Sequence, residues 1–411
     1  MLSFSRTMGL EEAKSSLAHA ITSGKFPHAL LVHGPEGVGQ NPLLLDLADL
    51  LLCEDASGNR PCGHCAGCLG RKRNNLDNLI FIMPLEKKEK ASSEGEMEGA
   101  QVDELALKAK EFHDDPYGFA RTEKSRINIA QVRDLQGRLS FAEASRKPRI
   151  VVILWAETMP QEAANALLKT LEEPPQNTYF LLSSDDRASL LPTILSRCTQ
   201  LAVFPMEVAA FAATLAEKGP ALGIESVPTR LLPFADGSLG TLLALHRNGG
   251  DTLLEEARAC LESALSGDWR VFSDYLDASG GFADMESASR LIHFLLRMIR
   301  LFHRLEALEG RERTDHAEDG VPANDALTSS NDVSKNDAAP DFAWTTEALR
   351  RQGFDPGLAP YLGPLENGPD LLALSGWLEE ILAAVQAYAK PKVAALGLYL
   401  EFEGKYARKE A

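Results

Sequence analysis

The chain has 411 residues, a formal net charge of −17, 45% hydrophobic and 25% charged residues, a composition typical of a soluble protein long enough for two or three domains. The acidic balance argues against a surface that binds nucleic-acid phosphates throughout, and no run of 18 apolar residues argues for a membrane span. Six cysteines are too few for a disulfide scaffold, and the amino terminus lacks a secretory hydrophobic segment, so we expect a cytoplasmic protein.

The first 206 residues alternate between strand-like and helix-like segments. Continuous apolar runs such as RIVVIL are typical of parallel strands that are covered on both faces, and helices between them predict a doubly wound α/β domain. We expect strands at 29–33, 78–83, 149–154, 178–184 and 200–204, and helices at 9–23, 41–52, 130–139 and 161–173. A charged insertion at 86–126 interrupts the pattern, and we expect it to be mobile at its start.

A glycine loop follows the first expected strand. Gly34 and Gly39 have the spacing of the phosphate-binding G-x-x-x-x-G-K-[ST] motif. Gln40 replaces the lysine that reaches the phosphates, and Asn41 replaces the hydroxyl that holds magnesium. A neutral amide loses the charge-assisted phosphate contact. The sequence therefore predicts a loop that keeps its architecture without binding a nucleotide.

The helix after this loop carries its own start signals. Asn41 is a favoured N-cap residue. Pro42 is favoured at the first helical position and lacks an N–H that could face a phosphate. We therefore expect a helix start that satisfies its own polar groups without an anion.

Four cysteines come next, in a C-x8-C-x2-C-x2-C array formed by Cys53, Cys62, Cys65 and Cys68. Thiolates at this spacing can converge on one tetrahedral zinc ion, and nearby glycines and a proline supply the tight turns. Buried free thiols or a redox pair are the alternatives, but the clustering favours structural zinc. His64 lies between two of the ligands and could replace one of them.

Basic residues gather between Arg121 and Arg149, where eight Lys or Arg accompany three acidic residues. A solvated helix face and a strip facing nucleic acid both fit this composition. Arg133 and Arg138, on the expected helix at 130–139, are the candidates for approach to DNA.

The strand at 149–154 lacks the acids of a hydrolytic site. Nucleotide-hydrolysing domains end this strand with carboxylates for magnesium and for the attacking water. Here it ends in Leu154 and is followed by Trp155. Glu157 is the first carboxylate, and we expect it to be an exposed acid at the start of a helix.

From residue 208 onward, strand-like segments give way to Ala- and Leu-rich helical segments. A polar, turn-rich stretch at 310–340 interrupts them, and its composition predicts a disordered loop.

The stretch AANALLKTLEEPPQNTYFLLSSDDRASLLPTILSRC, at 163–198, resembles the AAA+ clamp-loader family of bacterial DNA polymerase III, whose members open a sliding clamp ring. FPHALLVHGPEGVG, the cysteine array, INIAQVRDLQ and LKTLEEPP follow that family in order and spacing. The resemblance covers roughly residues 9–206, and beyond them it is limited to helical character and position. It implies that the four cysteines form the family's zinc module.

The resemblance also implies a role for Arg197. Ser196, Arg197 and Cys198 match the family's Ser-Arg-Cys motif, whose arginine enters the ATP site of a neighbouring subunit. Such an arginine finger stabilises the charge that develops in phosphoryl transfer. Without the family context, Arg197 would be an ordinary surface ion-pair residue. We expect Cys198 to be a small buried packing residue.

Several family residues have no match in this chain. The phosphate-loop lysine, the magnesium hydroxyl and the acidic pair are missing, and Gly240 stands where the arginine of the sensor 2 motif would be. The resemblance therefore implies a member that does not hydrolyse ATP itself.

The domains and partners follow from the resemblance alone. It implies an AAA+ α/β core at 1–206 with the zinc module at 53–68, a helical lid at 207–250 and a helical collar for oligomerisation at 251–411. The implied partners are the delta and gamma/tau subunits, the beta sliding clamp and, through the complex, primer–template DNA. Structural zinc is the implied cofactor, and Arg197 would serve an adjacent gamma/tau ATP site.

Two other functions stay open. The first is a self-sufficient AAA+ ATPase of the gamma/tau type with an unusual loop, which tight Mg-ATP binding by the isolated chain would favour. The second is a zinc-dependent nucleic-acid binder acting alone, which requires DNA affinity that depends steeply on salt and disappears without zinc. The net charge of −17 speaks against the second function.

Overall fold

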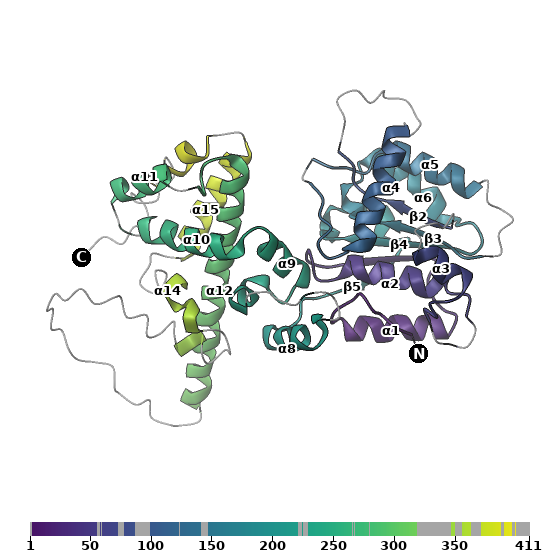
Figure 1. Cartoon of the computed structure of the whole chain (residues 1–411), viewed down its shortest axis with the longest axis horizontal. Coiled ribbons are helices and arrows are strands. Elements are labelled where there is room, and N and C mark those ends of the chain that lie inside the picture. The colour runs from purple at the N-terminus through teal and green to yellow at the C-terminus, as the bar shows by residue number, and fades with distance from the viewer. Residues whose placement is uncertain are drawn as a thin grey trace. The chain divides into compact units, whose positions relative to one another are not determined.

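The computed structural model (Figure 1) describes residues 2–55, 58, 60–72, 78–86, 99–122, 124–140, 147–220, 224, 229–264, 266, 268–278, 280–318, 347–349, 356–362, 371–387, 390–396 and 399. The chain divides into two compact units. The first comprises residues 1–226 and 235–244, and the second comprises residues 227–234 and 245–411.

The first unit is built on a parallel five-stranded sheet, as predicted. The strands are β1 (Ala29–His33), β2 (Leu79–Ile82), β3 (Arg149–Ile153), β4 (Thr178–Ser184) and β5 (Thr199–Ala202). Their order is β2-β3-β4-β1-β5, and Leu31 of β1 lies between Leu182 of β4 and Gln200 of β5. The carboxyl ends of β1, β3 and β4 are therefore neighbours at one edge, where ligands bind in open parallel sheets.

Helices cover both faces of this sheet (Figure 1). Helices α1 (Glu11–Thr22), α2 (Gln40–Leu52) and α4 (Gly99–Asp114) share one apolar core with strand residues such as Val32 and Val152. Helices α5 (Ile129–Ser140), α6 (Gln161–Glu172) and α7 (Pro192–Leu195) share the other with alternate strand residues such as Leu31 and Val151. Successive side chains of a strand point to opposite faces, which explains why continuous apolar strands separate two cores.

The remaining helices of this unit are α3 (Ala66–Lys72), α8 (Val208–Lys218) and the first part of α9 (Leu239–Arg247). Helix α4 lies inside the charged insertion, where no helix is predicted. The predicted mobile start of that insertion, at 87–98, lies outside the described residues.

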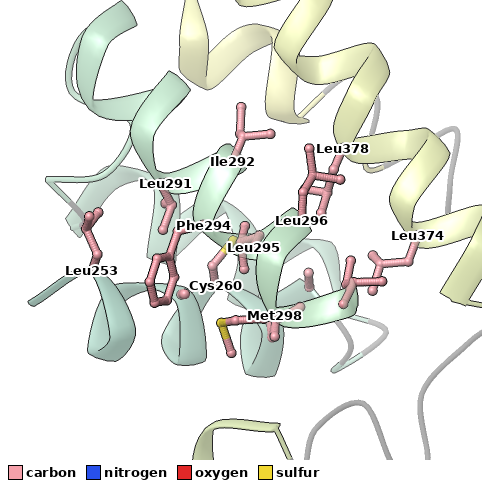
Figure 2. Packing of buried hydrophobic residues seen from close by; sticks show 14 of the residues in the cluster. Leu253, Cys260, Leu291, Ile292, Phe294, Leu295, Leu296, Met298, Leu374 and Leu378 are labelled. Atoms are coloured by element: carbon pink, nitrogen blue, oxygen red, sulfur yellow. The ribbon is translucent and has the colours of Figure 1, made fainter. Parts of the chain in front are cut away.

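Every element of regular secondary structure that is described in the second unit is a helix. A 3-10 segment at Thr229–Ala235 precedes α10 (Gly250–Ala264), α11 (Trp269–Ala278), α12 (Met285–Glu318), α14 (Ala359–Leu362) and α15 (Leu371–Gln386), with a second 3-10 segment at Pro356–Leu358. Figure 2 shows Leu291 and Leu296 of α12 in one buried cluster with Cys260 of α10 and Leu378 of α15. One apolar core thus joins the long α12 to its neighbours.

The disordered loop predicted to begin at residue 310 is wrong in its first part. Helix α12 continues through Glu318, whereas 319–340 lie outside the described residues. The sequence after Gly310 is polar but rich in arginine and glutamate, which are good helix formers, so its polarity does not break the helix. Among the described residues, no helix is both long and apolar enough to cross a membrane.

Candidate functional site

The glycine loop after β1 is filled by a side chain of its own chain. Gln40 is only 1% exposed. Its amide nitrogen donates to the carbonyl oxygens of Gly34 and Pro35, both at 3.0 Å, and its amide oxygen accepts the N–H of Gly39 at 3.1 Å. In a working motif the loop N–H groups bind phosphate. Here the Gln40 amide uses one of those donors and lies inside the loop itself.

The predicted helix start is wrong in its details. Helix α2 begins at Gln40, and its N-cap is Gly39 at φ 123°, a conformation that favours glycine. Asn41 caps nothing, because its Oδ1 is buried without a hydrogen-bond partner among the described residues. The helix start does satisfy one of its own N–H groups, but the side chain that does so is Gln40.

Asp185, which the sequence analysis did not single out, joins the loop to the end of β3. Its Oδ1 accepts from the Gln40 amide at 2.7 Å, and its Oδ2 accepts from the indole nitrogen of Trp155 at 2.7 Å. Burial raises the pKa of Asp185 to about 7, and the nearby Glu157 and Glu36 add to this rise. The indole that follows β3 thus binds the same carboxylate as the loop does. The acidic pair after β4, at 185–186, was the only signal in the sequence.

Glu157 is buried, so the prediction of an exposed acid is wrong. Its side chain is 6% exposed, and its Oε1 accepts the backbone N–H of Asp185 at 3.4 Å and lies 3.8 Å from the Arg121 guanidinium. Burial raises the pKa of Glu157. Trp155 adopts a left-handed conformation with φ 52°, which precedes the 3-10 turn Ala156–Thr158 that carries Glu157. This unusual conformation could not be foreseen from composition.

The amino end of α9 closes the loop on another side. The N–H of Gly240 donates to the carbonyl of Gly37 at 2.9 Å, and the Ser238 hydroxyl donates to the carbonyl of Glu36 at 3.2 Å. A Cβ atom added to Gly240 would lie 2.6 Å from the Cα of Gly37. Gly240 is therefore a packing requirement, because any larger side chain, such as an arginine, would push α9 off the loop.

The four cysteines converge, as predicted for a metal site. The Sγ atoms of Cys53, Cys62, Cys65 and Cys68 all lie within 4.8 Å of one another, and those of Cys62 and Cys68 are 3.9 Å apart. Zinc–sulfur bonds of about 2.3 Å in a tetrahedron place sulfurs about 3.8 Å apart. The N–H groups of Cys65 and Cys68 point at neighbouring sulfurs at 3.3 and 3.4 Å. The cluster could hold one metal ion, and its donor set fits structural zinc.

This cysteine module is attached to the far end of α2. Cys53 directly follows α2, Cys62 and Cys65 lie on the turn into α3, and Cys68 lies in the first turn of α3 itself. Arg71 of α3 is 3% exposed and contacts Asp49 of α2 at 2.9 Å. A Cβ atom on Gly67 would lie 2.1 Å from the carbonyl oxygen of Leu52, so the two helices touch through backbone. The imidazole of His64 is exposed and contacts the Cys62 carbonyl, outside the group of sulfurs.

Arg197 lies between α7 and β5, and its side chain is 29% exposed. The structure does not leave its guanidinium free: Nε donates to Glu172 at 2.7 Å and Nη1 donates to the Thr193 carbonyl at 2.9 Å. Cys198 is 7% exposed in the core of the sheet, as expected of a packing residue. Burial raises the pKa of the Cys198 thiol to about 11.

Not all of the basic residues between Arg121 and Arg149 lie on the surface. Arg149 is 5% exposed and donates to the Leu139 carbonyl, and Lys147 pairs with Glu54 at 2.9 Å. Arg133 is exposed on α5, and Arg138 lies 3.9 Å from Asp134 on the same helix. Residues 123 and 141–146 lie outside the described part of the chain. Arg149 therefore does not belong to an exposed strip, because β3 carries it into the interior.

Removal of one cysteine should test the metal site. Freshly purified protein should contain about one zinc ion per chain, and Cys65→Ser should lower both zinc content and the free energy of unfolding, the latter by on the order of 4 kcal/mol, because a closed shell loses a ligand. Metal analysis and denaturant unfolding measure both. Cys198→Ala, which removes a buried thiol outside the cluster, should keep the zinc. Reduced wild-type protein without metal would refute the assignment.

A methyl group at Gly240 should test the contact between α9 and the loop. Gly240→Ala should destabilise the chain by about 1–3 kcal/mol, because the added Cβ collides with backbone. The matched control is Gly137→Ala in α5, where nothing lies within 4 Å of the added Cβ; it should stabilise by about 0.5–1 kcal/mol. The denaturant midpoints of both variants measure these changes. If the two substitutions had the same effect, α9 would not pack against the loop as the structure shows.

Comparison with known proteins places the first unit in one family. The family described as "DNA polymerase III, delta subunit" matches residues 9–207. The chain is 31% identical over 182 residues to the DNA polymerase III subunit delta' of Haemophilus influenzae, covering 44% of each chain. It is 33% identical over 222 residues to the subunit delta' of Pseudomonas aeruginosa, covering 54% of this chain and 56% of the relative.

Subunits named tau are similar as well. The chain is 29% identical over 205 residues to the DNA polymerase III subunit tau of Escherichia coli, covering 50% of this chain and 26% of that subunit. The matched regions thus span about half or less of the length of these relatives. Together with the order of motifs along a parallel α/β sheet, these matches show that residues 9–207 of the chain belong to the AAA+ clamp-loader family of bacterial DNA polymerase III.

Proposed function

We propose that this chain is the delta-prime subunit of a DNA polymerase III clamp loader, a subunit that helps to load the sliding clamp without hydrolysing ATP itself. The observation that carries the proposal is the Gln40 amide, which bonds the loop N–H of Gly39 and two loop carbonyls. Hydrolysis needs a lysine, a magnesium ligand and a water-orienting carboxylate together. The loop carries an amide in place of the lysine, and an indole follows the strand where the acids would stand.

The proposed domains are the AAA+ core at 1–206, the lid at 207–250 and the collar at 251–411. The end of the sheet at Ala202 supports the first boundary, and the helices of the second unit support a helical collar, although the two compact units divide the proposed lid between them. The close contact between Gly240 and Gly37 also supports it, because it attaches the start of α9 to the loop at the position where a lid meets a nucleotide. A lid held this closely against the loop would leave little room for a nucleotide between them.

In the proposed complex, Arg197 acts as an arginine finger that enters the ATP site of an adjacent gamma/tau subunit. The position of Arg197 supports this role: it follows the short helix α7, precedes the edge strand β5 and is partly exposed. Burial of Cys198 anchors the backbone next to it. A planar guanidinium binds phosphate oxygens through two parallel N–H groups, which a lysine cannot do.

The remaining partners follow from the same assignment. The delta subunit, the beta clamp and primer–template DNA would be reached within the complex, and Arg133 and Arg138 on α5 are the candidates for contact to DNA. The cysteine module would hold zinc as a structural element, since all four positions of a tetrahedral shell are cysteines and none is left for water.

A self-sufficient ATPase of the gamma/tau type is the alternative. Only the similarity to subunits named tau favours it. The Gln40 amide inside the loop and the glycine-to-glycine contact with α9 argue against it.

Truncation of Arg197 should slow ATP hydrolysis by a partner. In a complex reconstituted with gamma/tau, Arg197→Ala should reduce kcat at the adjacent site by about 10³-fold or more and leave its KM for ATP nearly unchanged, because the lost contact acts in the transition state. Arg197→Lys should be nearly as damaging, because a point charge does not reproduce the guanidinium fork.

The assay is ATP hydrolysis in the presence of clamp and primed DNA. Arg187→Ala is the matched control, since this exposed arginine donates to Gln200 of the same chain and should be dispensable. Wild-type rates with both Arg197 variants would end the proposal that this chain supplies an arginine finger.

A further inference from the structure

Most N–H groups of the Arg197 guanidinium donate hydrogen bonds within the same chain. Nε and Nη2 both donate to Oε1 of Glu172, the first at 2.7 Å. Nη1 donates to the Thr193 carbonyl at 2.9 Å and to the Ser196 hydroxyl at 3.2 Å. A guanidinium has five N–H groups, so these contacts use most of its donors and oppose its charge with a carboxylate.

Both members of this pair have rigid attachments. Glu172 is the last residue of α6, whose Leu167 and Leu171 are fully buried in the core of the sheet. The N–H of Arg197 donates to the carbonyl of Ile194 at 3.1 Å, and the next residue, Cys198, is buried. The core therefore holds the two backbones in place, and only the two side chains can separate.

The pair is weak enough to be opened. The side chains of Arg197 and Glu172 are 29% and 46% exposed, and ion pairs at such exposure contribute about 0–1 kcal/mol. Phosphate oxygens compete well for the guanidinium because bidentate, charge-assisted bonds are stronger than exposed pairs. While Glu172 stays bound, however, its negative charge opposes the approach of a phosphate.

We propose that Glu172 is a positioning residue that holds the guanidinium of Arg197 in a neutralised resting position, from which the phosphates of a nucleotide on the adjacent subunit displace it. This inference rests on the proposed function of Arg197. By this proposal Glu172, the first of the two glutamates in the LKTLEEPP segment, slows ATP hydrolysis by the adjacent subunit when clamp and DNA are absent.

The test is a set of charge-neutral substitutions in the reconstituted complex. Glu172→Gln should raise the rate of ATP hydrolysis without clamp and DNA about two- to fivefold, the range expected for loss of an exposed ion pair. The rate with clamp and DNA, and the KM for ATP, should stay unchanged, because the pair is already open in the stimulated state. Glu173→Gln, at the adjacent exposed carboxylate, is the matched control and should behave as wild type.

The Arg197→Ala background separates the possible outcomes. There Glu172→Gln should have no effect, because no guanidinium is left to restrain; an increase that persists would mean that Glu172 acts directly on the neighbour's phosphates, which overturns the inference. An unchanged or lower resting rate with Glu172→Gln, while Arg197→Ala still slows hydrolysis, would overturn the role of Glu172 and leave the proposed function intact. If Arg197→Ala itself had no effect, the proposed function would fail.

Discussion

The hydrogen bonds of one amide inside the glycine loop determine the character of the whole site. Gln40 binds two loop carbonyls, the N–H of Gly39 and Asp185 at once, so one of the N–H groups that could otherwise face a phosphate is bonded to a side chain of the same chain. Trp155 binds the other oxygen of Asp185, and Gly240 brings α9 onto the same loop. These contacts therefore support one another, and replacing one of the residues would leave the other contacts in place.

Helix α2 connects this loop to the cysteine module. The loop is at its first residue, Gln40, and Cys53 directly follows its last, so the two sites are separated by about 20 Å at 1.5 Å per residue. The helix is almost entirely buried, and even its Asp46 accepts hydrogen bonds from the backbone of Arg6 and Thr7. A metal at one end of such a rigid helix would stabilise the position of the loop at the other. The module and the loop are thus parts of one structural element.

Residues that act through local sequence could be predicted, and those that act through the topology could not. The strands, the cysteine array, and the residues Gln40, Trp155 and Gly240 were visible as apolar runs, spacing or substitutions in a motif. Asp185 and Glu172 were missed because they meet Gln40 and Arg197 only when strands and helices that are distant in sequence become neighbours. The Asn41 cap and the exposed Glu157 were wrong for a related reason: local preferences were overruled by a buried amide and by the left-handed Trp155.

Binding of Mg-ATP to the isolated chain tests the central claim most directly. Titration calorimetry with wild-type protein and with Gln40→Lys should show no saturable binding up to about 1 mM. A Kd above about 1 mM corresponds to a binding free energy weaker than about 4 kcal/mol. The lysine variant should fail as well, because Trp155 and the contact between Gly240 and Gly37 remain. Saturable micromolar binding by the wild-type chain would contradict the account, because the Gln40 amide would then be a displaceable occupant of a working nucleotide site.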